Sequence, residues 1–466
     1  MSEAELRIEI DEGVRSFDDG RTLLGGSPLR IVRVTAAGAA LVERWRRGEP
    51  VSATPAHRSL ARRLVDGGLA HPRWSTSPFT PADVTVVIPV RDDADRLAAT
   101  VEAVAGVGAV VVVDDGSTEP AAIGRSAGEA TVVRRPTSGG PAAARNEGLR
   151  TVETPLVAFV DADCVPAPGW LDHLLPHLVD DRVGAVAPRV RSAPGTTLLE
   201  RYEDARSPLD LGGRPGRVAL RTALAYVPTA CLLCRREVPT FDERLRFGED
   251  VDLVWRLVEG GAIVRYDPST VVDHGPRTSW RDWWRQRRGY GSAAAPLARR
   301  HPGAVAPVVV SRWSALAWSL VALRRPLVGV AVAVVSAALL PRKLRPSGVP
   351  QREAVGLALR GHAAAGRHLA EGVRRTWWPI ALAGGVLSGR VRPALVAAAL
   401  VPVAAEWVER RPSIDPLRYV GLRLADDVAY GTGVWRGCIT ERSIAALRPD
   451  LSDWPGRSDP ADAPSI

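Results

Sequence analysis

Acidic residues stand at the ends of two apolar runs that read as buried strands. Asp114 and Asp115 follow residues 109–113, and Asp161 and Asp163 follow residues 156–160. Two carboxylates at positions i and i+2 can hold Mg²⁺ or Mn²⁺, and such a cation can neutralise a diphosphate leaving group. One acidic pair is also common in solvated loops. Two acidic clusters that each close a strand indicate a shared ligand site.

A glycine-rich entry leads into a helix predicted over residues 141–150. The amide groups at its N-terminus can hold an anion, and Arg145, one turn later, could reach a phosphate. An ordinary junction between a loop and a helix would have the same sequence.

Glu249 and Asp250 precede another predicted helix, residues 251–257. A carboxylate at a helix start that faces a cleft could act as general base on an acceptor hydroxyl. Taken alone, Asp250 could equally be a helix N-cap.

The elements that must position these residues alternate between strands and helices. Continuous β-branched runs predict buried parallel strands, and helical patterns lie between them. This repetition predicts an α/β fold with a mostly parallel open sheet and a ligand site beyond the carboxyl ends of its strands. The predicted strands are residues 84–90, 109–113, 130–133 and 156–160.

The chain has 466 residues, 46% of them apolar and 24% charged, which predicts a folded, multi-domain protein. A turn signal between short β-rich runs, two helical patterns and a closing strand predict a winged-helix-like module at the N-terminus. The expected parts are residues 1–75 for this module, 76–82 for a linker, 83–295 for the catalytic domain, 296–447 for an apolar helical region and 448–466 for a disordered tail.

The composition excludes several classes of protein. The chain has 61 basic and 52 acidic residues, and its net charge of +9 fits phosphate-bearing ligands, anionic membrane or a GC-rich genome. Its one lysine, Lys343, follows Arg342, so a P-loop nucleotidase is excluded. Cys231 and Cys234 enclose two leucines, which favours buried thiols over a zinc site. No apolar signal core opens the chain, so residues 1–303 are expected in the cytoplasm.

Three apolar runs follow the predicted catalytic domain. They cover residues 304–323, 326–340 and 379–407, and basic pairs flank the second run. A spanning helix needs roughly 20 apolar residues, so these runs are borderline, and a soluble helical domain stays open. Flanking arginines favour contact with anionic lipid, so we expect the protein at the cell membrane, on its cytoplasmic face.

In their order along the chain, these motifs resemble the signature of the inverting family 2 glycosyltransferases with the GT-A fold, which is Rossmann-like with a mostly parallel sheet. The resemblance covers roughly residues 83–295 and rests on residues 114–117, on 140–148 with Arg145 and Asn146, on 161–163 and on 249–250.

This resemblance implies roles for single residues. Asp93 and Asp115 would contact the nucleobase of the donor, with Arg145 near its phosphates. Asp161 and Asp163 would contact ribose, diphosphate and a Mg²⁺ or Mn²⁺ ion, and Asp250 would be the base. His274 matches a position that supplies a further metal or phosphate ligand in some members, although a structural histidine also fits.

One motif departs from the processive members of this family. They carry Gln-x-x-Arg-Trp, whereas Gly289 and Tyr290 stand at the Arg and Trp positions here, which argues against a polymer-extruding synthase. The tryptophan- and arginine-rich stretch 280–290 predicts an interfacial amphipathic helix over the active site, or a soluble helix packed on the domain. The expected acceptor or interface residues are Glu249, Trp280, Trp284, Gln286 and Arg288.

The N-terminal module points to one group of transferases within this family. Residues 24–28, 35–41 and 64–72 look like peptide-recognition winged-helix domains of ribosomal-peptide maturation. Their fusion to a family 2 transferase resembles the transferases of mycofactocin systems. This resemblance implies that UDP-glucose is the donor and that glucose units are added in succession through β-1,4 linkages (oligoglycosylation). It also implies that the acceptor is a peptide-derived redox cofactor precursor. A precursor peptide would then dock on residues 1–75.

Two alternatives remain open. A polyprenyl-phosphate sugar synthase would share the four motifs but use a lipid acceptor. A non-enzymatic scaffold that binds peptide or DNA would rest on residues 1–75 alone. The predicted helix 55–66 offers only a thin basic stripe for phosphate contacts, so we expect no nucleic-acid partner.

Overall fold

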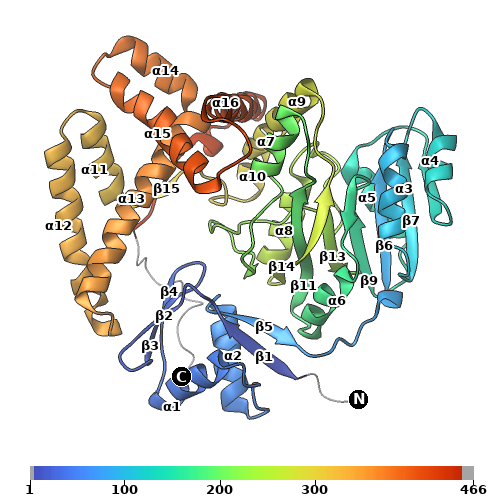
Figure 1. The fold of residues 1–466 in the computed structure, drawn as a ribbon, viewed down its shortest axis with the longest axis horizontal. Coiled ribbons are helices and arrows are strands. Elements are labelled where there is room, and N and C mark those ends of the chain that lie inside the picture. Colours follow the sequence, from blue (N-terminus) through green and yellow to red (C-terminus); the bar gives the residue numbers. More distant parts are fainter. Residues whose placement is uncertain (1–4, 454–466) are drawn as a thin grey trace. The chain divides into compact units, whose positions relative to one another are not determined.

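The computed structural model describes residues 5–453 and divides into two compact units, Met1–Thr278 and Ser279–Ile466 (Figure 1). The boundary lies before helix α9 (Trp280–Ser292), which was expected in the catalytic domain up to residue 295. Instead, α9 packs along α16 (Pro416–Thr440) in the second unit.

The first unit opens with the predicted N-terminal module. Ile8, Leu23, Trp45, Leu64 and Leu69 form its core. The predicted hairpin and helices are present, and strand β1, which was not predicted, pairs antiparallel with β5. The elements are β1 (Leu6–Ile10), β2 (Arg15–Phe17), β3 (Thr22–Gly25), β4 (Arg30–Arg33), α1 (Ala36–Arg46), α2 (Pro55–Asp66) and β5 (Ala70–Trp74).

A nine-stranded sheet follows within the described residues, with the order β10-β14-β11-β13-β9-β6-β7-β8 and β12 paired with β14. The four predicted strands form its parallel half, so the predicted mostly parallel α/β sheet is confirmed. The strands are β6 (Val84–Val90), β7 (Ala109–Asp115), β8 (Thr131–Arg135), β9 (Leu156–Val160), β10 (Cys164–Pro166), β11 (Val183–Ser192), β12 (Gly216–Arg217), β13 (Cys231–Arg235) and β14 (Ile263–His274).

Helices and buried apolar side chains stabilise this sheet. Val86, Ile88 and Val112 are fully buried, which fits β-branched strands that are covered on both faces. Cys231 and Cys234 are free and buried on β13, as predicted. The helical elements are α3 (Ala94–Ala103), α4 (Pro120–Ser126), α5 (Pro141–Arg150), α6 (Trp170–Leu174), η2 (Leu175–Val179), α7 (Leu198–Arg206) and α8 (Glu249–Glu259).

The antiparallel strand β13 decides which strand ends meet. It runs opposite to both β9 and β11, and β11 runs parallel to β14. Strands β9 and β14 therefore share a direction, and their carboxyl ends lie at one edge of the sheet. There Cys164 of β10 pairs with His274 of β14, which brings the acidic segment after β9 beside the end of β14.

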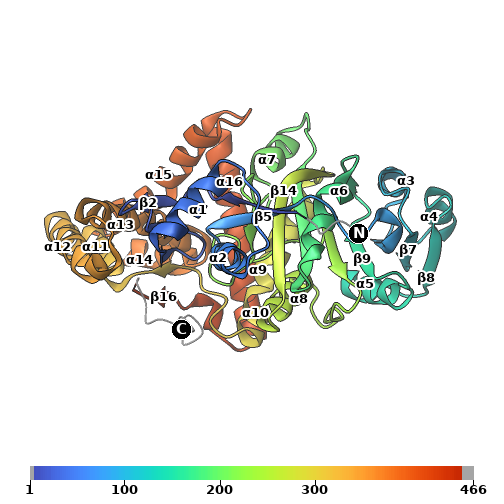
Figure 2. The same cartoon turned by 90° about the horizontal axis from the view of Figure 1, so that it is seen from below.

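The second unit is helical. Helices α11, α12 and α13 lie side by side in both views (Figures 1 and 2). Added Cβ atoms at Gly291 and Gly433 would meet the carbonyl oxygens of Tyr430 and Arg288, so these glycines permit the close contact of α9 with α16. The helices are α10 (Ala294–Arg300), α11 (Arg312–Ala322), α12 (Pro326–Leu344), α13 (Gln351–Arg375), α14 (Trp378–Leu387) and α15 (Arg392–Arg410).

The tail predicted to be disordered from residue 448 begins with structure. Strand β16 (Asp450–Leu451) pairs in parallel with β15 (Val309–Val310). The pairing holds the start of this segment against β15 within the second unit. Residues 454–466, the rest of the predicted tail, lie outside the described residues.

Candidate active site

Asp163 lies at the edge of the sheet where β9 and β14 end. Its backbone carbonyl accepts a hydrogen bond from the amide of Gly275 at 2.9 Å, which ties it to the segment after β14. Its carboxylate Oδ2 lies 3.5 Å from Nε2 of His274, 3.5 Å from Arg96 and 3.8 Å from Arg277. The predicted residues Asp163 and His274 are thus brought together.

Burial lowers the pKa of His274, and the nearby Asp163 opposes that shift only in part. The imidazole is therefore held in the neutral form over a wider pH range than a free histidine. A neutral imidazole nitrogen is the form that binds a metal ion.

Arg145 connects two of the acidic motifs. Its guanidinium donates to Oδ1 of Asp161 at 2.6 Å and to Oε1 of Glu249 at 3.0 Å. It also lies over the ring of Phe241, 5.4 Å from the centroid. Burial lowers the pKa of Arg145, but the two carboxylates more than offset this and hold the pKa above its ordinary range. Arg145 therefore positions Asp161 and Glu249, and its predicted contact with phosphate remains a prediction.

Glu249 and Asp250 occupy the first turn of α8, as predicted. Burial, with a smaller contribution from Asp250, raises the pKa of Glu249 to about 7. Burial also raises the pKa of Asp250. Oδ1 of Asp250 accepts a hydrogen bond from the amide of Val251 at 2.8 Å. A carboxyl group with a raised pKa, as at Asp250, is suited to proton transfer near neutral pH.

Asp115 lies at the end of β7, where its carboxylate holds the glycine-rich loop before α5. It accepts hydrogen bonds from the hydroxyl of Ser138 at 2.6 Å and from the amides of Gly139 at 3.0 Å and Gly140 at 2.8 Å. Arg135 adds an ion pair at 2.9 Å. These contacts fix the loop that begins α5, and the predicted contact of Asp115 with a nucleobase remains a prediction.

Asp93 precedes α3, on the same side of the site as Asp163. Burial raises the pKa of Asp93, although Arg96, 3.7 Å away, lowers it. Arg96 therefore lies near two acidic residues, Asp93 and Asp163.

Sequence reasoning missed Arg96, Arg277 and the role of Asn146. Asn146 was quoted only within the family motif, yet its side chain bonds both the carbonyl and the amide of Phe241, at 2.9 and 2.8 Å. These bonds hold the ring beneath Arg145. The three-residue spacing of Asp93 and Arg96 across the start of α3 was the available signal for Arg96.

The comparisons with known proteins show the family of this chain. Residues 85–239 match the family described as Glycosyl transferase family 2. Over 464 residues, the chain is 41% identical to the pre-mycofactocin glycosyltransferase of two Mycobacterium tuberculosis strains, CDC 1551 and H37Rv, across 95% of this chain and 97% of the relative. The chain belongs to glycosyl transferase family 2. The family predicted from the motifs is confirmed.

Two more distant similarities complete the comparison. This family 2 transferase is 31% identical over 205 residues to the succinoglycan biosynthesis protein ExoU of Rhizobium meliloti, across 39% of this chain and 58% of that protein. In structure it is similar to a mannosyltransferase from Pyrobaculum calidifontis in complex with GDP-Man and Mn²⁺. The TM-score is 0.37, the identity 19%, and the match covers 72% of this chain and 90% of that one.

The predicted metal ligands of this family 2 transferase do not form a complete set by themselves. Among residues 5–453, no group of three His, Cys, Asp or Glu side chains is placed to hold a metal ion. Oδ1 of Asp161, one of the predicted ligands, accepts a hydrogen bond from Arg145. Asp163 and His274 fit a Mg²⁺ or Mn²⁺ ion that takes its other ligands from phosphate oxygens and water, as Mg²⁺ commonly does.

The expected acceptor residues are divided between the two units of this family 2 transferase. Glu249 belongs to the site, whereas Trp280, Trp284, Gln286 and Arg288 lie on α9 of the second unit. The indoles of Trp280 and Trp284 are exposed on α9. The buried Arg287 pairs with Asp426 of α16 at 3.2 Å, so α9 is anchored on one face. An acceptor role for these four residues remains a prediction.

Proposed function

We propose that this family 2 transferase moves glucose from UDP-glucose to a peptide-derived cofactor precursor in mycofactocin biosynthesis. The 41% identity with pre-mycofactocin glycosyltransferase, which extends along 95% of the chain, is the observation that carries this proposal. We further propose that transfer inverts the anomeric centre and depends on a divalent metal, and that β-1,4-linked sugars are added in succession.

In this proposal Asp163 and His274 hold the Mg²⁺ or Mn²⁺ ion, with Asp161 beside them. When bound, the ion would neutralise the negative charge that the diphosphate gains as it leaves. Arg145 keeps Asp161 and Glu249 in place through its two hydrogen bonds. Asp93 and Asp115 would contact the nucleobase.

Asp250 is the better candidate than Glu249 for the base. Glu249 is buried and bound by Arg145, so its carboxylate serves an ion pair. The Asp250 carboxylate accepts a hydrogen bond from the Val251 amide through Oδ1, and the hydrogen bonds of the Arg145 guanidinium go to Asp161 and Glu249 instead. Asp250 would accept the proton of the acceptor hydroxyl as the oxygen attacks the anomeric carbon.

The direct test is transfer by the purified full chain. We expect a pre-mycofactocin acceptor to gain hexoses from UDP-glucose, as read by mass spectrometry, and a chelator to stop the reaction until Mg²⁺ or Mn²⁺ is restored. The Asp163→Ala variant should lose metal-dependent UDP binding in calorimetry. If transfer occurred only from another nucleotide sugar, UDP-glucose would be rejected as the donor. Full activity in the presence of chelator would reject the proposed dependence on a metal ion.

The raised pKa values predict an acidic limb in the rate profile. Glu249 is protonated as the pH falls through about 7, and the raised pKa of Asp250 means that it takes up its proton at a higher pH than an ordinary aspartate. The value of kcat/KM should therefore fall as the pH falls, with an apparent pKa that belongs to the pair. Glu249→Gln removes one neighbouring carboxyl, so the limb should move to lower pH. An unchanged limb in Glu249→Gln would argue against a contribution of Glu249.

We also propose that the second unit contacts the cytoplasmic face of the cell membrane. In the described residues, one helix, Pro326–Ser347, is long and apolar enough to span a membrane, and 17% of its apolar window is buried. Leu327 and Val330 of α12 are exposed, and so are Leu382 and Leu387 of α14. Arg324 and Arg325 precede α12 and fit anionic headgroups.

Binding to lipid vesicles tests this contact. The full chain should sediment with vesicles that contain phosphatidylglycerol, and Leu327→Glu with Val330→Glu should reduce the bound fraction several-fold because glutamate is costly in the apolar layer. Leu417→Glu on α16 is the matched control, because Leu417 and Leu327 are 83% and 84% exposed. Equal loss in both variants, or equal binding to neutral vesicles, would contradict the proposal.

A further inference from the structure

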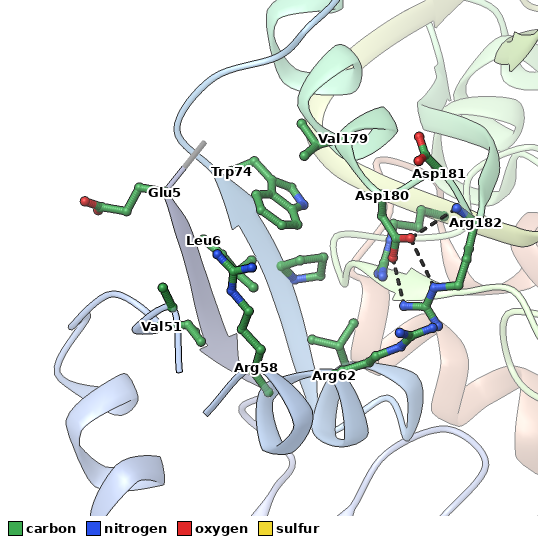
Figure 3. A pocket seen from close by; sticks show the side chains of 15 residues that line it. Glu5, Leu6, Val51, Arg58, Arg62, Trp74, Val179, Asp180, Asp181 and Arg182 are labelled. Atoms are coloured by element: carbon green, nitrogen blue, oxygen red, sulfur yellow. Dashed lines mark hydrogen bonds and ion pairs between the residues drawn. The ribbon is translucent and has the colours of Figure 1, made fainter. Parts of the chain in front are cut away.

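A cavity of about 730 Å³ lies within the first unit, between the N-terminal module and the catalytic domain (Figure 3). Elements β1, β5 and α2 form one wall, and the segment after η2 together with β14 forms the other. The volume lies in the range of small-molecule sites, about 300–1,000 Å³. None of the residues that line the cavity belongs to the donor site described above.

The wall on the N-terminal module is mainly apolar. Leu6 and Trp74 are paired across β1 and β5 and share one face of this small sheet with Pro72. Val51 and Val65 extend the same wall. Figure 3 shows the indole of Trp74 at the cavity. This wall suits the apolar or aromatic body of a ligand.

Several of the charged residues that line the cavity are already paired. Arg182 donates to Asp180 at 2.9 Å and to Asp66 at 3.1 Å (Figure 3 shows the pair with Asp180). Arg62 lies 3.7 Å from Asp66. These ion pairs join the module to the catalytic domain and leave little positive charge for a ligand.

Arg265 of β14 is different. Its side chain lines the cavity, the residue is only 4% exposed, and its Nε is buried without a hydrogen-bond partner. The carboxylates of Asp180 and Asp66 act on its charge electrostatically. Burial lowers the pKa of Arg265 to about 10. A buried N–H group without a hydrogen-bond partner costs free energy, and an anion in the cavity that accepted a hydrogen bond from this guanidinium would reduce that cost.

We propose that this cavity is a second binding site, which takes a ligand with one carboxylate on an apolar or aromatic body. The carboxylate would accept hydrogen bonds from Arg265, and the body would pack on Trp74 and Leu6. Inorganic phosphate has no apolar body to pack on Trp74 and Leu6, so it should bind more weakly than such an acid. A free acid and the C-terminal residue of a peptide share this chemistry. The proposal does not depend on the donor or acceptor proposed above.

Calorimetry on the full chain, without nucleotide sugar, tests the site. N-acetyl-L-phenylalanine should bind, and its amide and inorganic phosphate should bind at least tenfold more weakly. Arg265→Met should weaken binding of the acid about 10- to 100-fold, the usual range for a lost charged hydrogen bond. Its unfolding temperature should change little, because the removed cost of burying the charge offsets the lost attraction to Asp180 and Asp66. Arg214→Met, which removes an exposed arginine outside the cavity, should bind as the native chain does.

Several results would overturn the proposal. The acid could fail to bind, or the amide or phosphate could bind as tightly as the acid. The Arg265→Met variant could also bind the acid with the affinity of the native chain. Trp74→Ala is a second, independent variant and should also weaken binding of the acid. A hexapeptide that ends in phenylalanine separates the two sources: tighter binding than the free acid would assign the site to a peptide terminus, and weaker binding to a small acid. Transfer activity is not a readout here.

Discussion

Asp250→Asn is expected to lower the kcat of glycosyl transfer by about 100- to 10,000-fold, the range that a general base contributes. Asparagine keeps an oxygen that can accept the hydrogen bond from the Val251 amide, so the start of α8 should remain folded. It has no group that can take a proton at neutral pH. Binding of the donor nucleotide, measured by calorimetry, should change little.

Glu259→Gln is the matched control because it neutralises a carboxylate at the other end of the same helix. Its kcat should stay close to the native value. If the kcat of Asp250→Asn lay within a few-fold of the native value, the assignment of Asp250 as the base would be rejected. Glu249→Gln would then become the variant to examine for loss of transfer.

The second large effect is expected on stability. Arg145→Met leaves two carboxylates, Asp161 and Glu249, without their shared partner, and Glu249 is buried. Removing one member of a buried ion pair costs about 3–5 kcal/mol, so we expect a loss near the lower end because Asp161 is partly exposed. Urea unfolding followed by circular dichroism measures this loss.

The pH dependence of this loss has a definite sign. Without Arg145, the pKa of Glu249 should rise further above about 7, because the arginine lowers it in the native chain. The carboxyl is then charged mainly at high pH, so the loss should be larger at about pH 8 than at about pH 5. Arg150→Met on the same helix removes an exposed pair with Glu147 and should cost less than about 1 kcal/mol. Equal losses in the two variants would contradict the role of Arg145.

The sequence by itself determined the parallel half of the sheet and the family. Strands 84–90 and 156–160 were predicted to the residue, because a buried parallel strand needs an unbroken β-branched run and the chain contains few such runs. The carboxylates beyond their ends follow from the same rule, since ligands bind at the carboxyl edge of such sheets.

Tertiary structure alone decided which side chains face one another. Arg145 was predicted to approach phosphate, but the fold places it between Asp161 and Glu249, which are 16 and 104 residues away in the chain. Arg265 drew no attention in the sequence because an arginine on a strand is ordinary. Its burial beside the cavity, with Nε lacking a hydrogen-bond partner, made it notable. Periodicity reports which face of an element is buried. It does not report which distant segment covers that face, and for charged groups that covering segment decides whether the charge is paired.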